Sequence, residues 1–506
     1  MRVDGKPRFY NGVLNMISAS MLYDYITCPH RTYMDMFSDI EDRDESNPFV
    51  ELLWEHGNAF EKQVIESLDT SFLDLSSSGG DEKERLTTEA IEAREPLIYS
   101  GRISEGNLLG EPDILRLDAT GYVAIDIKAG SGEESSGDER KPKKHYAVQL
   151  ALYTDILERK GLSAARRAFV WDIKGEEVLY DFMEPYGKKD PRTLWQDYEE
   201  IMGAVTGILK EDNKTLPAYA SSCGLCHWYT ECVSALEEAD DLTLIPSLGR
   251  AKRDVMFDTV ATIRAFANSD LDGFLEGKKT IFSGIGIASL QKFQTRAKLI
   301  SDNGAAFLTQ NVALPEFDKE LFFDIEVDPM RDCCYLHGFV ERRGGDDATE
   351  RFVYFFADNA TPEAEKKAFA DAWSYIQESQ PCGIYYYSKY ERTIYRKLQV
   401  KYPDVCTSEE IEALFNPNTS FDLYYDYVNK YTEWPSRGYG IKYLAKYLGF
   451  DWRDEHPSGA ASIEWFHRFT ETSDDAIKQR ILDYNEDDCR ATRVLLDGIR
   501  NLPITA

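Results

Sequence analysis

The chain has 506 residues, with 89 acidic and 58 basic side chains, a formal charge of −31 and 43% hydrophobic residues. The length predicts two or three domains, the composition excludes a disordered chain, and the lack of a signal peptide or membrane-spanning run predicts a cytoplasmic protein with no membrane partner. The net charge taken alone argues against a polyanionic ligand such as nucleic acid, because phosphate binding needs a basic surface.

The first candidate catalytic residues lie in two adjacent predicted strands. Gly110–Leu117 and Tyr122–Gly130 are predicted to form a hairpin. Since side chains alternate along a strand, Asp126 and Lys128 lie on the same face of the second strand. With Asp113 they bring two carboxylates and a lysine to one end of a sheet, where such a set can bind Mg²⁺ and activate water. The alternative is a surface hairpin with an ordinary acid–base pair.

A buried helix is predicted directly after this hairpin. Lys143–Leu157 is apolar around much of its circumference, and His145, Gln149 and Tyr153 share one polar stripe because they lie four residues apart. Polar groups on a buried helix need partners, and we expect to find them on the neighbouring charged strands.

Four cysteines have the spacing of a metal or cluster site. One lies near the N-terminus and three follow much later in the pattern C-x2-C-x5-C; they are Cys28, Cys223, Cys226 and Cys232. Four thiolates can hold an iron-sulfur cluster or a structural zinc ion. A zinc site in which His30 or His227 replaces one cysteine is the alternative.

Residues 17–236 resemble the PD-(D/E)XK nucleases of the RecB type. The resemblance rests on the acidic hairpin, the helix with Gln149 and Tyr153, and the cysteines. The one-plus-three cysteine arrangement is similar to the iron-sulfur subgroup, which includes AddB and CRISPR-associated nucleases. The resemblance implies a [4Fe-4S] cluster on the four cysteines. It also implies that Asp113 and Asp126 bind a metal ion, with Lys128 and Gln149 as catalytic residues.

One stretch departs from this family. The family carries a His-Glu pair on an early helix, and here Glu61 matches the acid, implied to be a further metal ligand. Phe60 stands where the histidine is expected. His56, one helical turn earlier, is either its substitute or an ordinary surface histidine.

Residues 237–312 are predicted to form short helices with a DNA-binding turn. Gly284 and Gly286 lie in a G-h-G pattern typical of a helix-hairpin-helix, and residues 245–253 are a poorer copy of it. Such turns present backbone N–H groups to a DNA phosphate, with basic side chains such as Lys292 nearby. A purely structural helical linker is the alternative.

The second candidate catalytic set begins with an acidic strand. Asp324 and Glu326 project from one face of the predicted strand Leu321–Val327, and near the chain end Tyr484 and Asp488 lie four residues apart on a helix. Carboxylates in an apolar strand are costly unless they bind a metal ion, so these residues are predicted to be functional. A half-exposed edge strand is the alternative.

The order of this acidic strand, further strands, a helix and the final Tyr-x3-Asp resembles the DnaQ-like 3′–5′ exonucleases of the DEDD class. By that resemblance Asp324, Glu326 and Asp488 bind two metal ions, and Tyr484 positions the attacking water. For the remaining acid of the class, Glu391 is the first candidate. Asp422 is the second candidate.

The sequence therefore predicts an α/β protein with three parts. A PD-(D/E)XK restriction-endonuclease-like domain (1–236) and an RNase H-like exonuclease domain (313–506) are joined by a small helical, helix-hairpin-helix-like segment (237–312). The expected activity is Mg²⁺- or Mn²⁺-dependent hydrolysis of DNA ends or single strands, in repair, recombination or handling of foreign DNA. Because no helicase motif is present, a separate helicase or CRISPR or recombination proteins are the expected partners. RNA processing and a scaffold with one decayed site are the rival functions.

Overall fold

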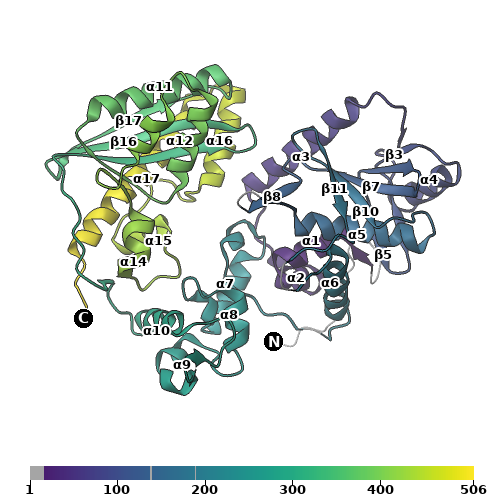
Figure 1. The fold of residues 1–506 in the computed structure, drawn as a ribbon, viewed down its shortest axis with the longest axis horizontal. Coiled ribbons are helices and arrows are strands. Elements are labelled where there is room, and N and C mark those ends of the chain that lie inside the picture. Colours follow the sequence, from purple (N-terminus) through teal and green to yellow (C-terminus); the bar gives the residue numbers. More distant parts are fainter. Residues whose placement is uncertain (1–15, 137–138, 188–189, 213, 506) are drawn as a thin grey trace. The chain divides into compact units, whose positions relative to one another are not determined.

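The computed structural model describes residues 16–136, 139–187, 190–212 and 214–505. Its elements fall into two compact units, and each is described here by itself (Figure 1). The first unit comprises Met1–Pro217 with Ser221–Cys232, and the second comprises Ala218–Ala220 with Val233–Ala506. The opening residues, where no signal peptide is expected, lie outside the described part. Within that part, no helix is both long and apolar enough to cross a membrane.

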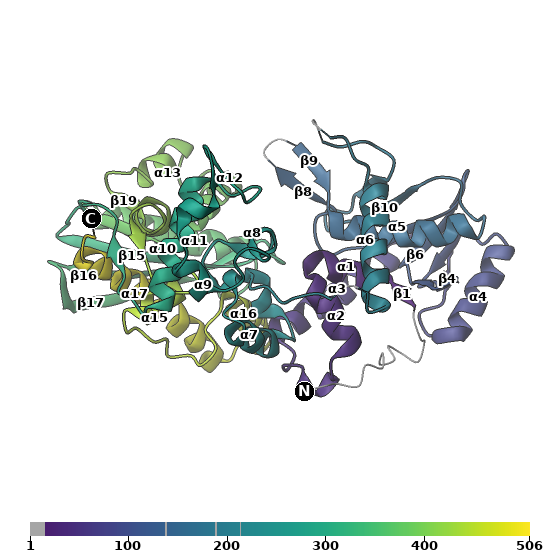
Figure 2. The same ribbon diagram turned by 90° about the horizontal axis from the view of Figure 1, so that it is seen from below.

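The first unit is built on a six-stranded mixed sheet. Its strands, in spatial order, are β11 (Glu177–Asp181), β10 (Arg167–Trp171), β7 (Gly121–Ile127), β6 (Ile114–Asp118), β3 (Leu97–Tyr99) and β2 (Leu73–Asp74). The predicted hairpin is present, because β6 and β7 pair antiparallel, and β7 also pairs parallel with β10. A small second sheet contains β1 (Ile17–Ser18), β5 (Leu108–Gly110) and β4 (Ile103–Glu105). Figure 2 shows the hairpin of β8 (Glu133–Ser136) and β9 (Glu139–Pro142) projecting from this unit.

Helices cover both faces of this sheet. The helices of this unit are α1 (Ala19–Thr27), α2 (Pro29–Phe37), α3 (Pro48–Glu66), α4 (Gly80–Glu92), α5 (Lys144–Arg159) and α6 (Leu194–Leu209). The next helix, α7 (Tyr229–Glu238), begins in the first unit and continues into the second. Strand alternation divides β7 between two apolar clusters. Ile125 and Ile127 pack with residues of α3, whereas Tyr122 and Ala124 pack with α5. Asp126 therefore projects toward α5, the predicted polar helix.

The second unit contains a five-stranded sheet. Its spatial order is β17 (Asp346–Phe356), β16 (Cys333–Arg343), β15 (Lys319–Asp328), β18 (Gly383–Tyr386) and β19 (Ser420–Asp422). The first three strands pair antiparallel, and the last three pair parallel. The central strand β15 is thus hydrogen-bonded on both sides, which overturns the edge-strand alternative.

Helices cover the two faces of this sheet (Figure 1). They are α11 (Pro362–Ser379), α12 (Tyr390–Lys401), α15 (Ile441–Tyr447), α16 (Gly459–Thr472) and the 27-residue α17 (Asp475–Asn501). Leu321, Phe323 and Ile325 of β15 pack with α11 and α12, while Phe322 packs with α17. The even-numbered acids of β15 consequently share the face of α17.

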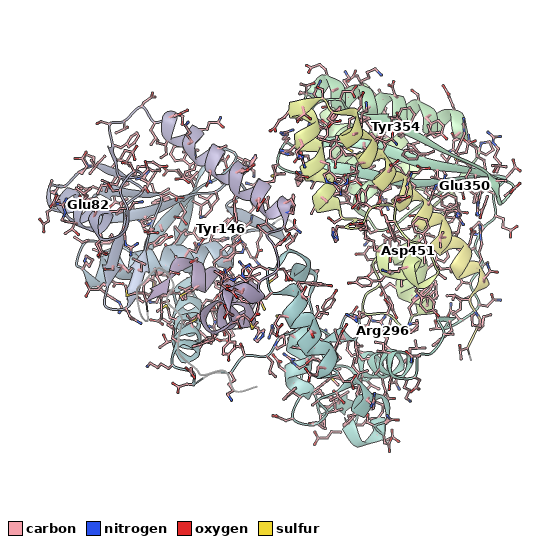
Figure 3. The ribbon with its side chains drawn as sticks, turned by 180° about the vertical axis from the view of Figure 1, so that it is seen from behind. Glu82, Tyr146, Arg296, Glu350, Tyr354 and Asp451 are labelled. Carbon is pink, nitrogen blue, oxygen red and sulfur yellow. The ribbon has the colours of Figure 1, made fainter. Side chains whose placement is uncertain are left out.

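The helical segment after α7 packs within the second unit. Its helices are α8 (Gly249–Met256), α9 (Ile263–Ala267) and α10 (Ile287–Ser301), and they enclose a small apolar core of their own. Arg296 of α10, labelled in Figure 3, is 2% exposed and joins the segment to the rest of the unit. Its guanidinium donates to the Glu433 carboxylate at 2.7 Å and to the Pro246 carbonyl at 2.8 Å.

Candidate active sites

Three carboxylates meet in the second unit. One oxygen from each of Asp324, Glu326 and Asp488 lies within 4.8 Å of the others. The first two come from β15 and the third from α17, so a central strand and the chain's last helix build the group together. The sequence pattern predicted this meeting correctly, although 161 residues lie between Glu326 and Asp488.

The surroundings of this acidic group favour a divalent cation. Burial, reinforced by the charge of Asp488, raises the pKa of both Asp324 and Glu326 above the usual carboxyl range. Three ionised carboxylates at this spacing repel one another strongly in a buried site. Hard cations such as Mg²⁺ and Mn²⁺ prefer oxygen donors and cancel this repulsion. The donor set therefore fits a divalent metal ion.

Tyr484 lies one helical turn before Asp488 and is tied to it. The Lys442 ammonium donates to the Tyr484 hydroxyl at 2.8 Å, and that hydroxyl is hydrogen-bonded to Asp488. Lys442 also lies 3.9 Å from the Asp488 carboxylate. The Trp452 indole donates to the same carboxylate at 2.7 Å. The lysine thus fixes the tyrosine hydroxyl beside the acids, a role that no pattern in the sequence indicated.

Asn485 is a second residue that sequence reasoning missed. It is fully buried, and its amide donates to the Asp324 carboxylate at 2.7 Å. Gly338 on β16 pairs with Asp324 and makes room for this amide. A Cβ at Gly338 would lie 1.6 Å from the Asn485 amide oxygen. The glycine and the asparagine therefore orient Asp324 as a pair.

The structure separates the two candidates for the remaining acid. Glu391 lies in the first turn of α12, is 3% exposed, and has a carboxylate oxygen with no hydrogen-bond partner. Burial raises its pKa, and the charges of Asp422 and Asp488 raise it further. Glu391 in turn contributes to the raised pKa of Asp324, so it lies near the acidic group. Asp422 instead accepts backbone N–H groups from Ser388, Tyr424 and Tyr425, each at 3.0 Å. Asp422 is a turn-capping residue, which favours Glu391.

Tyr390 precedes this acid and remains accessible. Its side chain is 47% exposed, and partial burial together with Cys334, Glu326, Glu391 and Asp324 raises its pKa to about 12. The ring therefore lies beside the acidic group without being enclosed by it.

In the first unit, the predicted acids and lysine also come together. Asp126 is 2% exposed, and its carboxylate lies 3.0 Å from the Lys128 ammonium. Asp113 accepts the backbone N–H of Ile127 at 2.7 Å. Burial, together with the Asp126 charge, raises the pKa of Asp113. Burial opposes the charge on Lys128, but the two aspartates still raise its pKa, so the lysine stays protonated.

Glu61 on α3 faces this pair of aspartates. Its charge contributes to the raised pKa of Asp113, and its carboxylate accepts the Tyr99 hydroxyl at 2.9 Å. Phe60, in place of the family's histidine, packs against the apolar cluster that contains Val64. An aromatic side chain there extends the core and offers no metal ligand.

The polar stripe of α5 points toward the same strands. The side-chain oxygen of Gln149 is buried without a hydrogen-bond partner. Tyr153 is 4% exposed, and a Cβ at Gly110 would lie 2.6 Å from its ring, so this glycine lets the tyrosine pack on the strand. Tyr146, labelled in Figure 3, has the Lys128 ammonium 5.7 Å from its ring centroid. These contacts match the predicted position of the helix beside the acids.

The four predicted cysteines lie near one another. Burial raises the pKa of the Cys232 thiol to about 12, with contributions from the three others: Cys226, Cys28 and Cys223. Four thiolates are the donors that an iron-sulfur cluster or zinc takes, and the assignment of either to these cysteines stays a prediction. His30 Nδ1 lies 2.9 Å from the Thr215 hydroxyl, and His227 Nε2 lies 2.7 Å from Asp35. Each histidine thus has a partner on one ring nitrogen, which leaves the choice between an all-cysteine site and a site with one histidine open.

Asp35 on α2 connects the two cysteine segments. One oxygen of its carboxylate accepts hydrogen bonds from Arg43 at 2.8 Å, His227 at 2.7 Å and Trp228 at 2.9 Å. The same helix follows Cys28, which is its N-cap residue. Asp35 thereby holds the loop that carries Cys226 against the helix that begins after Cys28.

Two parts of the chain match known superfamilies. Residues 35–233 match the profile of the PD-(D/E)XK nuclease superfamily, and residues 321–499 match that of the RNase_H superfamily. The chain joins a PD-(D/E)XK nuclease domain to an RNase H-like domain. A search of curated proteins gave no match. The two predicted fold classes are thus confirmed, whereas the RecB-type and iron-sulfur assignments stay predictions.

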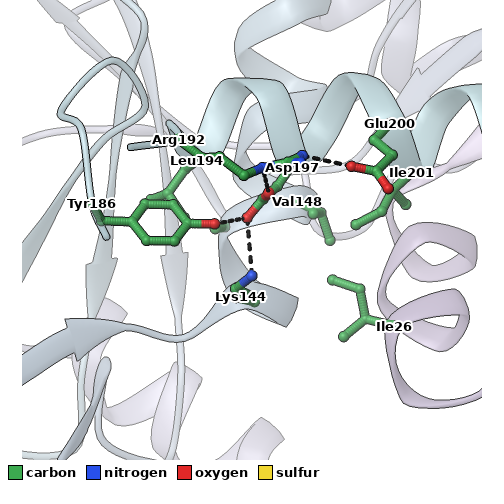
Figure 4. A pocket seen from close by; sticks show the side chains of 10 residues that line it. Ile26, Lys144, Val148, Tyr186, Arg192, Leu194, Asp197, Glu200 and Ile201 are labelled. Atoms are coloured by element: carbon green, nitrogen blue, oxygen red, sulfur yellow. Dashed lines mark hydrogen bonds and ion pairs between the residues drawn. The ribbon is translucent and has the colours of Figure 1, made fainter. Parts of the chain in front are cut away.

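The PD-(D/E)XK nuclease domain also has a surface pocket of about 420 Å³ beside α5 and α6 (Figure 4). Asp197 lies at its centre and pairs with Lys144 and Arg192, each at 3.1 Å. Arg192 also pairs with Glu200 at 2.5 Å. Because acidic partners already neutralise both cations, this pocket is part of the packing between the two helices.

Two similar turns lie in the segment that packs with the RNase H-like domain. Gly284 and Ser247 both have positive φ, 76° and 67°, and each turn closes with a backbone hydrogen bond of 3.2 Å. Gly284 and Gly286 are exposed at the start of α10. Lys292, predicted to contact DNA, instead donates to the Asn429 carbonyl at 2.9 Å and lies 3.6 Å from Glu433.

Proposed function

We propose that this protein is a metal-dependent nuclease with two active sites, one in each nuclease-superfamily domain, that hydrolyses DNA ends and single strands. The observation that carries the proposal is the buried group Asp324, Glu326 and Asp488, whose oxygens lie within 4.8 Å of one another. Bound Mg²⁺ or Mn²⁺ would polarise the scissile phosphodiester and lower the pKa of the attacking water.

In the RNase H-like domain, the chain's own residues supply orientation. Tyr484 lies beside Asp488 with its hydroxyl fixed by Lys442, so it can align a water molecule for attack. Glu391 completes the set of four acids that the DnaQ-like resemblance implies. This domain is proposed to act as a 3′–5′ exonuclease.

In the PD-(D/E)XK domain, Glu61, Asp113 and Asp126 are proposed as the metal ligands. Lys128 remains protonated beside Asp126 and is placed to stabilise the negative charge that develops on the phosphate. Gln149 offers a buried oxygen without a hydrogen-bond partner, which suits the orientation of water or substrate. Because position 60 is a phenylalanine and not the histidine of the family, we expect weaker metal binding here than in the RNase H-like domain.

The cysteine site is proposed to hold a [4Fe-4S] cluster on Cys28, Cys223, Cys226 and Cys232. The contributions of Cys28, Cys223 and Cys226 to the raised pKa of Cys232 support a site built from these four residues. Purified protein with iron and sulfide and visible absorbance is the expected result. Colourless protein with one zinc per chain would overturn the cluster.

The exposed glycines Gly284 and Gly286 are proposed to contact a DNA phosphate through backbone N–H groups. Lys292 is occupied by partners within the unit, so its share of this contact is expected to be small. Roles in repair, recombination or handling of foreign DNA, together with a separate helicase or CRISPR proteins as partners, remain part of the proposal.

The decisive experiment compares wild type with Lys128→Ala and Asp324→Ala on labelled single-stranded and duplex DNA and RNA, with Mn²⁺. Each variant should lose one activity and retain the other. Unchanged activity in both variants would contradict two active sites. Faster degradation of RNA than DNA would favour RNA processing, and an inactive wild type that still binds DNA would favour a scaffold.

A further inference from the structure

An exposed aromatic and basic surface lies at the edge of the acidic group in the RNase H-like domain. Its members are Lys389, Tyr390 and Tyr425; both tyrosines are accessible, 47% and 37%, and Lys389 is exposed. The Lys389 ammonium lies 4.2 Å from the Tyr425 ring centroid, and Tyr390 follows Lys389 directly in the chain.

The backbone holds this surface in an unusual conformation. Ser388 has a φ of 91°, which is rare for a residue with a side chain. Its N–H donates to Asp422 at 3.0 Å, and the same carboxylate oxygen accepts the N–H of Tyr425 at 3.0 Å. Asp422 therefore joins the turn before Tyr390 to the turn that carries Tyr425. Strained residues held by their surroundings gather at functional sites.

The chemistry of the surface matches single-stranded nucleic acid. Bases stack on aromatic rings regardless of their sequence, and lysine attracts the phosphates between them. The ring of Tyr390 is exposed, directly precedes Glu391, and lies near Asp324 and Glu326. Charge complementarity points the same way, because Lys389 adds an exposed cation next to Tyr390.

We propose that Tyr390 stacks on the 3′-terminal base of single-stranded DNA, that Tyr425 stacks on the preceding base, and that Lys389 contacts the phosphate between them. The proposal rests on the nuclease function proposed for the RNase H-like domain and gives it a substrate class. Two neighbouring bases that each stack on a separate ring have left the duplex stack and lost their pairs, so the surface selects frayed or single-stranded 3′ ends over blunt duplex ends.

The test measures DNA binding by Lys128→Ala protein, in which the other nuclease site is silenced. Ca²⁺ replaces the catalytic metal ion because it takes the same oxygen ligands. A labelled single strand is compared with one whose terminal nucleotide lacks its base. Loss of the base should weaken binding of the parent about tenfold, the usual worth of one stacked base. Tyr390→Ala should bind the complete strand about tenfold more weakly, and removal of the base should then have no further effect.

Matched variants separate the ring from its surroundings. Tyr390→Phe retains the ring and should bind within about twofold of the parent. Val400→Ala removes a 77% exposed apolar side chain from the same helix and should have no effect. Lys389→Ala should reduce the slope of log affinity against log salt by about 0.7, the share of one phosphate in a single strand.

The outcomes distinguish this proposal from the one on which it rests. If the Lys128→Ala parent degrades no strand with Mn²⁺, the nuclease function of the domain fails. If the parent degrades single strands but binds the strand without a terminal base equally well, the stacking proposal is wrong and the nuclease function stands. Equal binding of DNA by Tyr390→Ala and the parent would also overturn the stacking proposal.

Discussion

At the scale of single residues, the acids of the RNase H-like domain depend on neighbours that are not themselves metal ligands. Asn485 orients Asp324, and Gly338 provides the space that the Asn485 amide occupies. Lys442 holds Tyr484 and contributes a positive charge that lowers the pKa of Asp324 and Glu326. The acids were predictable from an alternating strand pattern, whereas these neighbours have no sequence signal beyond being polar or small.

Asn485→Asp should weaken metal binding and exonuclease activity about 10- to 100-fold, the usual cost of losing a partner that orients a ligand. The change keeps the shape of the side chain but replaces an N–H donor with a negative charge facing Asp324. The effect is measured by introducing Asn485→Asp into Lys128→Ala protein and recording exonuclease activity as Mn²⁺ is added, in comparison with Lys128→Ala alone. Asn501→Asp, at the exposed end of the same helix, is the control, and an equal loss there would contradict a specific role.

Lys442→Ala should move the pH dependence of Mn²⁺ binding toward higher pH. Without the ammonium, the carboxyl pKa values rise further, so protons compete with the metal ion over a wider range. Mn²⁺ affinity measured across neutral pH gives the shift. Lys442→Arg should restore the parent profile, and Lys446→Ala on the same helix should not alter it. A reduced rate with an unshifted profile would mean that Lys442 acts only through Tyr484.

At the scale of elements, helices bring together residues that are far apart in the sequence. Helix α17 carries Tyr484 and Asp488 to the acids of β15, and α5 carries Gln149 to Asp126 and Lys128. Helix α5 was predicted with nearly its observed extent, and for α17 the helical spacing of Tyr484 and Asp488 was predicted, because polar residues recur at helical spacing within apolar surroundings. The link between α2 and the cysteine loop through Asp35 was not predictable, since an isolated aspartate carries no pattern.

Asp35→Asn should lower the metal content of the cysteine site by more than half. The asparagine offers no charge to Arg43 and cannot accept from three donors with one oxygen as a carboxylate does. Iron, sulfide and zinc per chain, together with visible absorbance, report the result. Asp42→Asn, on the exposed segment after α2, is the control. Full metal content in Asp35→Asn would show that the cysteines organise themselves.

At the scale of the whole molecule, the two compact units each contain an acidic site with raised carboxyl pKa values. A group whose pKa is higher in the folded protein keeps its proton there, so its contribution to stability is complete at low pH and is lost as the pH rises. Bound cations reverse this trend, because ionised carboxylates bind them best. The net charge of −31 thus includes acids that need a cation at neutral pH.

Metal-free protein should therefore lose stability as the pH rises above the usual carboxyl range, and Mn²⁺ should raise its melting temperature more at high than at low pH. Thermal unfolding of the metal-free and Mn²⁺-loaded protein from about pH 5 to about pH 9 measures both effects. The variant Asp324→Asn/Glu326→Gln, with two neutral side chains, should show a smaller difference between the two forms. An Mn²⁺ effect independent of pH would contradict metal binding by these acids.

The sequence by itself determined the two nuclease folds, the order of their elements and the acids, lysine and cysteines of the candidate sites. It did so because side chains repeat with the period of a strand or helix. Carboxylates inside an apolar strand also cost free energy unless they bind a cation, and the spacing of the cysteines is typical of a metal or cluster site. Only the tertiary structure favoured Glu391 over Asp422, paired Lys292 with Glu433, and placed Tyr390 near the acids. Those outcomes depend on which segments, distant in the sequence, come into contact in the folded protein. The spacing of residues within one segment carries no information about such contacts.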